Sequence, residues 1–264
     1  MNNFLSINAL LAISLLPAGA AVLVPQAQLR WLEGHIRAGD PSVPGGGWNS
    51  DDHRETRTDE AAWGDQQDLI ASTSSTTVGS GRMGINSPAV GSGLTSVAAS
   101  GFADGRYTAT TADASADVST LSSFVLAFQV DEPVHYRLTG TVSSEQDDGR
   151  LHTDAWSLVT LRRITLPGDG STVVQETLVE KSVNDASNVF DVTGTLLPGF
   201  TYDVVGLSAI TLRNDPVDLL TGEGTASWNF NFEVTPVPEP AAGVAAAAML
   251  AGFAGWRRQK NARG

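Results

Sequence analysis

The chain contains no cysteine, so disulfide bonds, thiolate metal sites and a cysteine nucleophile are all excluded. Its stability must therefore come from packing. Basic residues are also scarce: 16 Lys and Arg stand against 29 Asp and Glu, which gives a formal net charge of -13 at pH 7. Binding to nucleic acid requires a basic surface that displaces counterions from phosphate. The composition therefore argues against a nucleic-acid partner.

Acidic residues are almost missing from the two ends of the chain. Residues 1–20 carry no charged side chain, and residues 237–264 carry one acidic and four basic residues. Subtracting these from the totals leaves 12 basic and 28 acidic residues in between, a balance of -16. The chain therefore divides into an uncharged N-terminal segment, an anionic body and a cationic tail.

The N-terminal segment has the pattern of a secretory signal peptide. A short apolar run over residues 4–16 is followed by Pro17 and then by Ala18 and Ala20, small residues at the spacing that a signal peptidase accepts. We predict that signal peptidase cleaves after Ala20 and that the rest of the chain is exported. The alternative interpretation is a buried N-terminal helix.

The C-terminal segment has the pattern of a membrane anchor. Residues 241–256 carry no charge and would form a helix about 24 Å long, against a hydrocarbon core of about 30 Å. The basic residues that follow are Arg257, Arg258, Lys260 and Arg263. Because positive residues stay on the cytoplasmic side of a membrane, this orientation leaves the body outside. The N-terminal signal requires the same orientation.

A triplet just before this apolar stretch makes the pattern more specific. Pro238, Glu239 and Pro240, an apolar stretch rich in Ala and Gly, and a terminal Arg cluster follow one another within the last thirty residues or so. This arrangement resembles the PEP-CTERM sorting signal. The resemblance implies recognition by an exosortase, a membrane-embedded enzyme similar to cysteine transpeptidases. Removal of the tail and transfer to the cell surface or extracellular matrix would follow.

The same resemblance assigns a role to each part of the tail. Pro238, Glu239 and Pro240 are the sorting motif, residues 241–256 are a transient membrane anchor, and the basic cluster is the stop signal. These residues are features of a substrate and catalyse nothing. The alternative interpretation is an ordinary C-terminal membrane anchor behind a Pro-rich linker.

The body beyond residue 68 is rich in Ser, Thr, Ala, Gly and Val, alternates apolar with polar residues and contains frequent turn residues. This pattern is typical of antiparallel sheets with one solvated face. We predict an all-β fold over residues 69–235, an antiparallel β-sandwich or jelly-roll-like domain between a signal helix and a transmembrane helix. The predicted strands cover residues 69–78, 106–114, 124–130, 134–143, 155–164, 172–182, 188–196, 201–212 and 225–235.

The segment before this domain has a mixed pattern. We predict that residues 21–68 form an irregular extension, with a short amphipathic helix near residues 28–37 and a solvated, charge-rich loop over residues 51–68. The predicted organisation is therefore a signal peptide, this extension, the sandwich and a sorting tail over residues 236–264.

Three apolar stripes predict the core of the sandwich, because alternate residues of a strand point to the same face. The stripes are Phe124, Leu126 and Phe128; Val134, Tyr136, Leu138 and Val142; and Trp228, Phe230 and Phe232. Residues 132–140 and 194–202 are also similar to strand and turn motifs of PEP-CTERM passenger domains, with a tight turn at Pro198 and Gly199. These motifs are structural and imply no activity.

Residues that could carry chemistry are dispersed along the sequence. The histidines, His35, His53, His135 and His152, have no metal-binding spacing, and neither a Gly-x-Ser-x-Gly elbow nor a phosphate loop is present. Neighbouring acids occur at Asp51 and Asp52, at Asp131 and Glu132, and at Asp147 and Asp148. Such pairs are more typical of soluble turns than of the facing carboxylates of a glycosidase. We predict no enzymatic activity and no cofactor.

Calcium is the one cofactor with which the sequence is compatible. Asp147, Asp148 and Gly149, and the segment from Asp215 to Asp218, place hard oxygen ligands in connections at an edge of the sandwich.

Three functions are compatible with this sequence. The first is a structural component of the cell surface or extracellular matrix. The second is a carbohydrate-binding module of the envelope or exopolysaccharide matrix, with Trp63 and Trp156 as candidate stacking residues. The third is a hydrolase with convergent carboxylates in a cleft. A row of exposed aromatic residues on one face would favour the second, and a face of Ser and Thr alone would favour the first.

Overall fold

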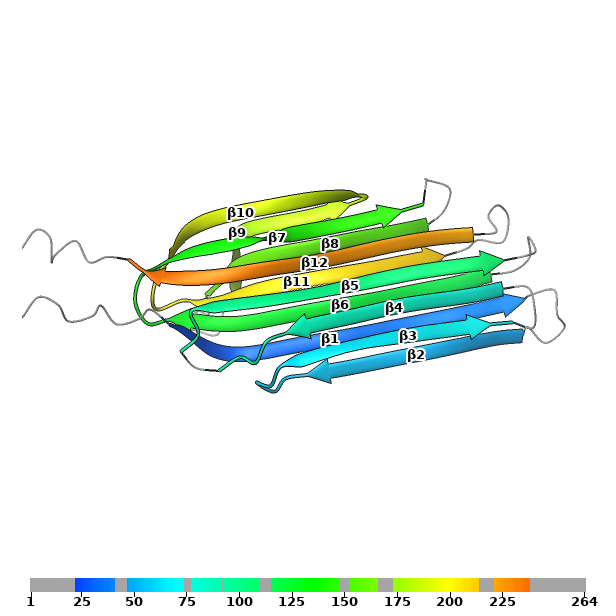
Figure 1. Cartoon of the computed structure of the whole chain (residues 1–264), viewed down its shortest axis with the longest axis horizontal. Coiled ribbons are helices and arrows are strands. Elements are labelled where there is room, and N and C mark those ends of the chain that lie inside the picture. Colours follow the sequence, from blue (N-terminus) through cyan, green and yellow to red (C-terminus); the bar gives the residue numbers. More distant parts are fainter. Residues whose placement is uncertain are drawn as a thin grey trace, which may run out of the picture. The chain divides into compact units, whose positions relative to one another are not determined.

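Twelve β-strands make up the part of the chain that the structure describes (Figure 1). The structure is a computed structural model. It describes residues 22–40, 47–73, 77–91, 93–109, 115–147, 152–165, 173–213 and 221–237. No helix is present within these ranges. Ala21–Thr235 forms one structural unit.

The strands pair antiparallel in two six-stranded sheets. Sheet A contains β1 (Leu23–Asp40), β2 (Gly47–Arg57), β6 (Ser115–Val130), β8 (His152–Thr165), β9 (Val174–Asn184) and β11 (Thr201–Arg213). Sheet B contains β3 (Trp63–Ser72), β4 (Thr77–Ser87), β5 (Ser96–Ala109), β7 (Val134–Gln146), β10 (Ala186–Leu196) and β12 (Thr221–Pro236). The order is β2-β1-β6-β11-β8-β9 in sheet A and β10-β7-β12-β5-β4-β3 in sheet B. The predicted all-β antiparallel sandwich is confirmed.

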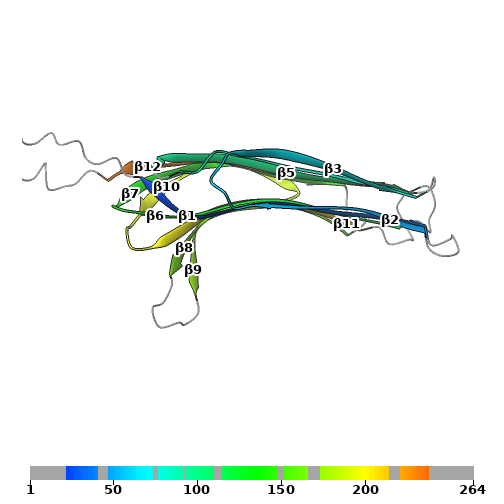
Figure 2. The same cartoon turned by 90° about the horizontal axis from the view of Figure 1, so that it is seen from below.

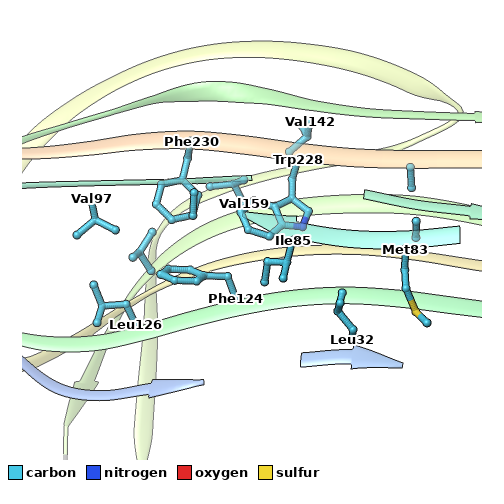
Figure 3. Close-up of a cluster of buried hydrophobic side chains, with 14 of the residues drawn as sticks. Leu32, Met83, Ile85, Val97, Phe124, Leu126, Val142, Val159, Trp228 and Phe230 are labelled. Atoms are coloured by element: carbon cyan, nitrogen blue, oxygen red, sulfur yellow. The ribbon is translucent and has the colours of Figure 1, made fainter. Parts of the chain in front are cut away.

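The core lies between the two sheets, and all three predicted stripes point into it (Figure 3). Aromatic pairs join the sheets, because the rings of Phe124 on β6 and Trp228 on β12 lie 6.3 Å apart, and those of Phe128 and Phe232 lie 5.3 Å apart. Alternation with a period of two gives each sheet one apolar inner face, and stacking the two sheets buries both inner faces.

The prediction of an irregular extension over residues 21–68 is wrong. β1, β2 and the first half of β3 occupy the described part of this segment. The helix expected near residues 28–37 is strand β1, in which Arg30, Leu32 and Ile36 share the inner face with a period of two. The charge-rich segment 51–68 is largely the edge strand β2 and the start of β3, whose charged residues keep these sheet edges from pairing with another chain.

Strand β4 is absent from the sequence-based prediction, which placed one strand over residues 69–78. The chain instead ends β3 at Ser72 and begins β4 at Thr77. Gly79 and Gly81 occupy two inner positions of β4. There is no room for a side chain at Gly81, where a Cβ would lie 2.6 Å from Thr120 of the opposite sheet. The close approach of the sheets therefore removes the apolar residues by which a strand is recognised.

The start of β1 and the end of β12 lie on the same side of the sandwich, which we call the proximal end (Figure 1). The connection between β4 and β5 holds them there, because Leu23 N donates to Leu94 O over 2.8 Å and Val234 N donates to Thr95 O over 2.9 Å. At the opposite, distal end, β1, β3, β5, β7 and β11 end, and β2, β4, β6, β8 and β12 begin (Figure 1).

The predicted turn at Pro198 and Gly199 is confirmed. It joins β10 of sheet B to β11 of sheet A, and Gly199 adopts a φ of 85°, which glycine accepts without strain. Tyr202 closes this turn, because its hydroxyl both accepts from Leu197 N and donates to Leu197 O, each over 3.0 Å.

Candidate functional site

The residues that the sequence assigns to processing lie outside the described part of the chain. These are Ala18, Ala20, Pro238, Glu239, Pro240, Arg257, Arg258, Lys260 and Arg263. The same holds for Asp148, Gly149 and the segment from Asp215 to Asp218 that the calcium interpretation uses. Among the described residues, no helix is long and apolar enough to span a membrane.

The adjacent acids Asp51 and Asp52, in the middle of β2, point in opposite directions. The Asp52 carboxylate pairs with His35 of β1, and Asp51 Oδ2 accepts a hydrogen bond of 3.0 Å from Ile70 N of β3. Successive residues of a strand face opposite sides of the sheet, so such neighbours cannot act on one substrate. In the described ranges, no three His, Asp or Glu side chains converge on a point where a metal ion could sit.

The outer face of sheet B is polar, unlike its inner face. The outward residues of its central strand β12 are Thr221, Glu223, Thr225, Ser227, Asn229, Asn231, Glu233 and Thr235. The neighbouring strand β7 adds Thr139, Thr141 and Ser143. This face is polar, but it is not a face of Ser and Thr alone, because Glu223, Asn229, Asn231 and Glu233 belong to it.

A hollow of about 540 Å³ lies on this face toward the distal end, and we call it the distal groove. It is lined by Asp68, Leu69, Ile70, Ser80, Gly81, Arg82, Asp104, Gly105, Arg106, Glu223, Gly224 and Thr225. These residues come from β3, β4, β5 and β12, so the groove crosses four adjacent strands.

The strand register arranges the polar side chains of the distal groove in two rows. One row contains Asp68, Arg82, Asp104 and Thr225. The second contains Ile70, Ser80, Arg106 and Glu223. Acidic and basic groups alternate over the first three strands of the first row, and Arg106 lies beside Glu223 in the second. Such cross-strand pairs stabilise the sheet.

Arg82 and Asp104 form the best-defined pair in the groove. Arg82 Nε and Nη2 donate to Asp104 Oδ2 over 2.9 and 2.5 Å. This hydrogen bonding, followed by the charge of the carboxylate, raises the pKa of Arg82 above its ordinary value. Because both partners remain partly exposed, their remaining hydrogen-bonding capacity is directed at solvent or a ligand.

A row of glycines lies under the groove. Gly81, Gly105 and Gly224 are paired in register and face the interior. A Cβ on Gly105 would lie 2.8 Å from Ile210 of sheet A. Because these three residues have no side chains, β4 and β5 lie close to sheet A at this level. The outer surface of sheet B is concave at the same level.

Phe102 provides an apolar surface beside the groove. It lies on the outer face of β5, two residues before Asp104, and it is half-buried. Its ring covers Gly84 of β4, where a Cβ would lie 2.5 Å from Phe102 Cε1. The guanidinium carbon of Arg82 lies 5.2 Å from the ring centroid. Phe102 therefore places an aromatic ring beside the charged donors and acceptors that line the groove.

The tryptophans named from the sequence lie elsewhere. Trp63 is buried at 9% exposure, whereas Trp156 is half-buried on the outer face of sheet A. No sequence motif singles out Arg82, Asp104 or Phe102, because only the register between β4 and β5 brings them together.

Comparison with known proteins identifies no relative. No protein-family model matches the chain, and no curated protein matches it. A structure of the Gx strain of infectious bursal disease virus aligns with 88% of this chain and 73% of that chain, at 11% identity and a TM-score of 0.17. A mutant VP2 protein of the same virus, from derived T=1 particles, aligns with 89% and 86%, at 10% identity and a TM-score of 0.16. Similarity at this level supports no conclusion about fold or function.

Proposed function

We propose that this chain is an exported, non-enzymatic protein of the cell surface or extracellular matrix. In this proposal residues 1–20 are a signal peptide that forms a helix, and residues 236–264 are a sorting tail with a transmembrane helix over 241–256. An exosortase recognises Pro238, Glu239 and Pro240, and the sandwich remains outside the membrane. A jelly-roll-like connectivity of its strands belongs to the same proposal.

The observation that carries this proposal is the position of the chain ends in the sandwich. Leu23 and Val234 are fixed at the proximal end by the same connection, at Leu94 and Thr95. β12, which precedes the proposed tail, therefore ends at the proximal end. Thr225, which lines the distal groove, lies nine residues before Val234 on β12. At the rise of an extended strand, the two residues are about 30 Å apart. This arrangement suits a protein that is attached at one end and presents the other.

Mass analysis of the intact protein from the organism that encodes it tests this proposal. The unmodified chain should lose residues 1–20 and the tail near Pro240. A variant in which Pro238, Glu239 and Pro240 are all alanine should keep its tail and remain with the membrane. An identical, unprocessed C-terminus in both proteins would contradict the sorting step and leave a membrane-anchored protein.

Carbohydrate binding is a second candidate function, and Phe102 favours it. Sugars present apolar C–H faces that stack on aromatic rings, and their hydroxyl groups pair with side chains such as Arg82 and Asp104. The groove crosses four strands and is open along the outer face of sheet B. A neutral polysaccharide fits this surface better than an anionic one because the body of the chain is acidic.

Affinity electrophoresis of the full chain in gels that contain a neutral polysaccharide tests this function. We expect retardation of the unmodified chain and its loss in Phe102→Ala. Val189→Ala is the matched control, because Val189 is 79% exposed on β10 and lies outside the groove. Equal mobility of the unmodified chain with and without polysaccharide would contradict binding.

A further inference from the structure

The outer face of sheet A has an apolar centre. Ten apolar residues of its four central strands point outward: Leu29, Trp31, Leu121, Val125, Ala127, Trp156, Leu158, Val205, Leu207 and Ala209. Most of them are half-buried, and Leu29 is 37% exposed. We call this surface the apolar face.

The strand register makes the apolar face continuous. At one level along the strands, Trp31, Ser123, Leu207 and Leu158 lie side by side on β1, β6, β11 and β8. At the next level lie Glu33, Leu121, Ala209 and Trp156. The side chains cover one another so closely that Ser123 and Val205 are only 7% exposed. A patch of this kind, in the middle of a sheet, is typical of a protein interface.

The two outer faces of the sandwich differ in this respect. At comparable central positions, sheet B carries Ser227, Asn229 and Asn231 on β12. A solvated outer face on one sheet and an apolar one on the other implies that the second sheet is covered when the protein is assembled.

The geometry points to a second copy of this chain as the partner: we propose that two copies pack through their apolar faces around a twofold axis that runs along the strands between β6 and β11. Sheet A has six strands, so this axis places β6 opposite the partner's β11 and β1 opposite the partner's β8. Residues near the axis keep their level along the strands, and an interface of this kind presents the same patch on both copies.

The sizes of the side chains fit this arrangement. Leu207 of one copy meets Ser123 of the other at the same level, and Leu121 meets Ala209 at the next. A large residue thus faces a small one at both levels, as interdigitating sheets require. Both contacts occur twice because of the twofold axis.

The charges on the apolar face do not oppose a second copy. The chain between the two ends has a balance of -16, so most of its surface repels another copy and an anionic membrane surface alike. On the apolar face, acids are matched by bases, as in the pair of Arg162 and Asp203 and the pair of Arg213 and Asp117. Two like-charged chains can therefore approach through this face.

The β8–β9 hairpin and the chain ends agree with this axis. The hairpin turns away from sheet B on the outer side of sheet A (Figure 2), and β9 shifts register against β8 between Leu161 and Arg162. In the dimer, each hairpin would lie along the partner's β1–β2 border. An axis parallel to the strands also keeps both proximal ends on one side. That last point rests on the proposed function, because attachment to one membrane requires it.

Crosslinking through a single introduced cysteine tests the dimer, because the native chain has no thiol. Leu207→Cys places a thiol beside the axis, and Ser227→Cys places one on the outer face of sheet B as the matched control. Cells that express each full chain are treated with a short bis-maleimide. We expect a covalent dimer from Leu207→Cys at a yield about tenfold above that from Ser227→Cys.

A size exchange tests the proposed packing itself. Leu207→Ser and Ser123→Leu should each weaken association of the full chain by about tenfold, and the double variant should recover it because a large residue again faces a small one. Association is followed by sedimentation, and thermal melting of each variant confirms folding.

Three results would overturn the dimer. Equal crosslinking of Leu207→Cys and Ser227→Cys is the first. The second is a product of Leu207→Cys with the mass of a different protein. The third is a Leu207→Cys thiol that forms no dimer and is shielded from a water-soluble maleimide only when membranes are present. Failure of the C-terminal processing would leave the crosslinking result unchanged, since an unprocessed chain carries the same face.

Discussion

The indole of Trp228 fills the space above Gly206, so that a Cβ on Gly206 would lie 2.3 Å from Trp228 Cε3. Trp228 belongs to β12 of sheet B, and Gly206 belongs to β11 of sheet A. On its other side the indole reaches Gly101 of β5, where a Cβ would lie 2.7 Å from Cζ2. One side chain therefore spans the space between the sheets, and two glycines make room for it.

Gly206→Ala should destabilise the fold, because the new methyl group must displace a fully buried indole. Overpacking of this kind costs about 1 to 3 kcal/mol in the free energy of unfolding. The control is Gly47→Ala, because a Cβ there would meet no atom within 4 Å. Urea denaturation of both variants measures the difference, and equal stabilities would show that the indole moves without cost.

Arg30 makes the second unusual contact between distant segments. Its side chain is fully buried, yet it donates to the main-chain oxygens of Asp59 and Ala61 over 2.6 and 2.5 Å and to Asp59 Oδ1 over 2.7 Å. These bonds hold the crossover from β2 to β3 against β1. The guanidinium group, first through its hydrogen bond, keeps the pKa of Asp59 below its ordinary value.

Arg30→Met should lower the free energy of unfolding by about 2 to 4 kcal/mol, because two carbonyl oxygens lose their donor while the side-chain volume is kept. Arg57→Met is the control: Arg57 is exposed and bonds to the neighbouring Glu55, so its loss should cost at most about 0.5 kcal/mol. Chemical denaturation compares the two. Equal losses in the free energy of unfolding would mean that the buried hydrogen bonds of Arg30 stabilise the fold no more than the exposed ones of Arg57.

Alternation of apolar and polar residues predicts the strands that have one apolar and one polar face. Strands in which this alternation is lost are missed. In β1, Leu29 and Trp31 lie on the apolar face, while Arg30 lies inside. Both faces therefore mix polar and apolar residues, and the spacing of Leu29, Leu32 and Ile36 imitates that of a helix. In β4 the glycines remove the signal instead. Neither cause can be recognised before the second sheet is known.

The candidate site was less predictable than the fold. The rows in the distal groove depend on the register between β4 and β5 and on the pairing of β5 with β12, which is far from β5 in sequence. Because a shift by one residue turns every side chain to the other face, the position of Arg82 beside Asp104 cannot be read from one chain. The same holds for the match of Leu207 with Ser123.

Stability should fall in acid, partly through one exposed pair. Arg137 Nε and Nη2 donate to the two oxygens of Asp191 over 2.9 and 2.7 Å, and this hydrogen bonding, with the charge of Arg137, lowers the pKa of Asp191 from its ordinary 3.8. A carboxyl group whose pKa is lower in the folded state contributes stability above the unfolded value. That contribution is lost as the pH falls from about 4 through the lowered pKa.

Asp191→Asn should therefore be less stable than the unmodified chain at neutral pH and should lose less stability on acidification. Denaturation midpoints measured from neutral pH to below pH 3 test this. If the two curves run parallel, Asp191 does not titrate with a lowered pKa. The comparison isolates this pair because the other carboxyl groups are the same in both proteins.

Removing one hydroxyl group should have opposite effects at two buried tyrosines. Tyr202→Phe keeps the ring that stacks on Phe128 at 5.8 Å, but it leaves the main-chain NH and CO of Leu197 without their partner. The expected cost is about 1 to 2 kcal/mol. Tyr107 is also fully buried, and its hydroxyl has no hydrogen-bond partner within the described residues.

Tyr107→Phe should therefore be neutral or stabilising, since it removes a buried polar group that gains nothing from folding. Burial, followed by the charge of Asp147, raises the pKa of Tyr107 above its usual 10.0. This shift adds an independent check. Above about pH 10 the unfolded chain ionises while the folded chain resists, so stability falls as the pH rises, and Tyr107→Phe should reduce that fall. A loss of stability at neutral pH like that of Tyr202→Phe would instead show that the Tyr107 hydroxyl is hydrogen-bonded.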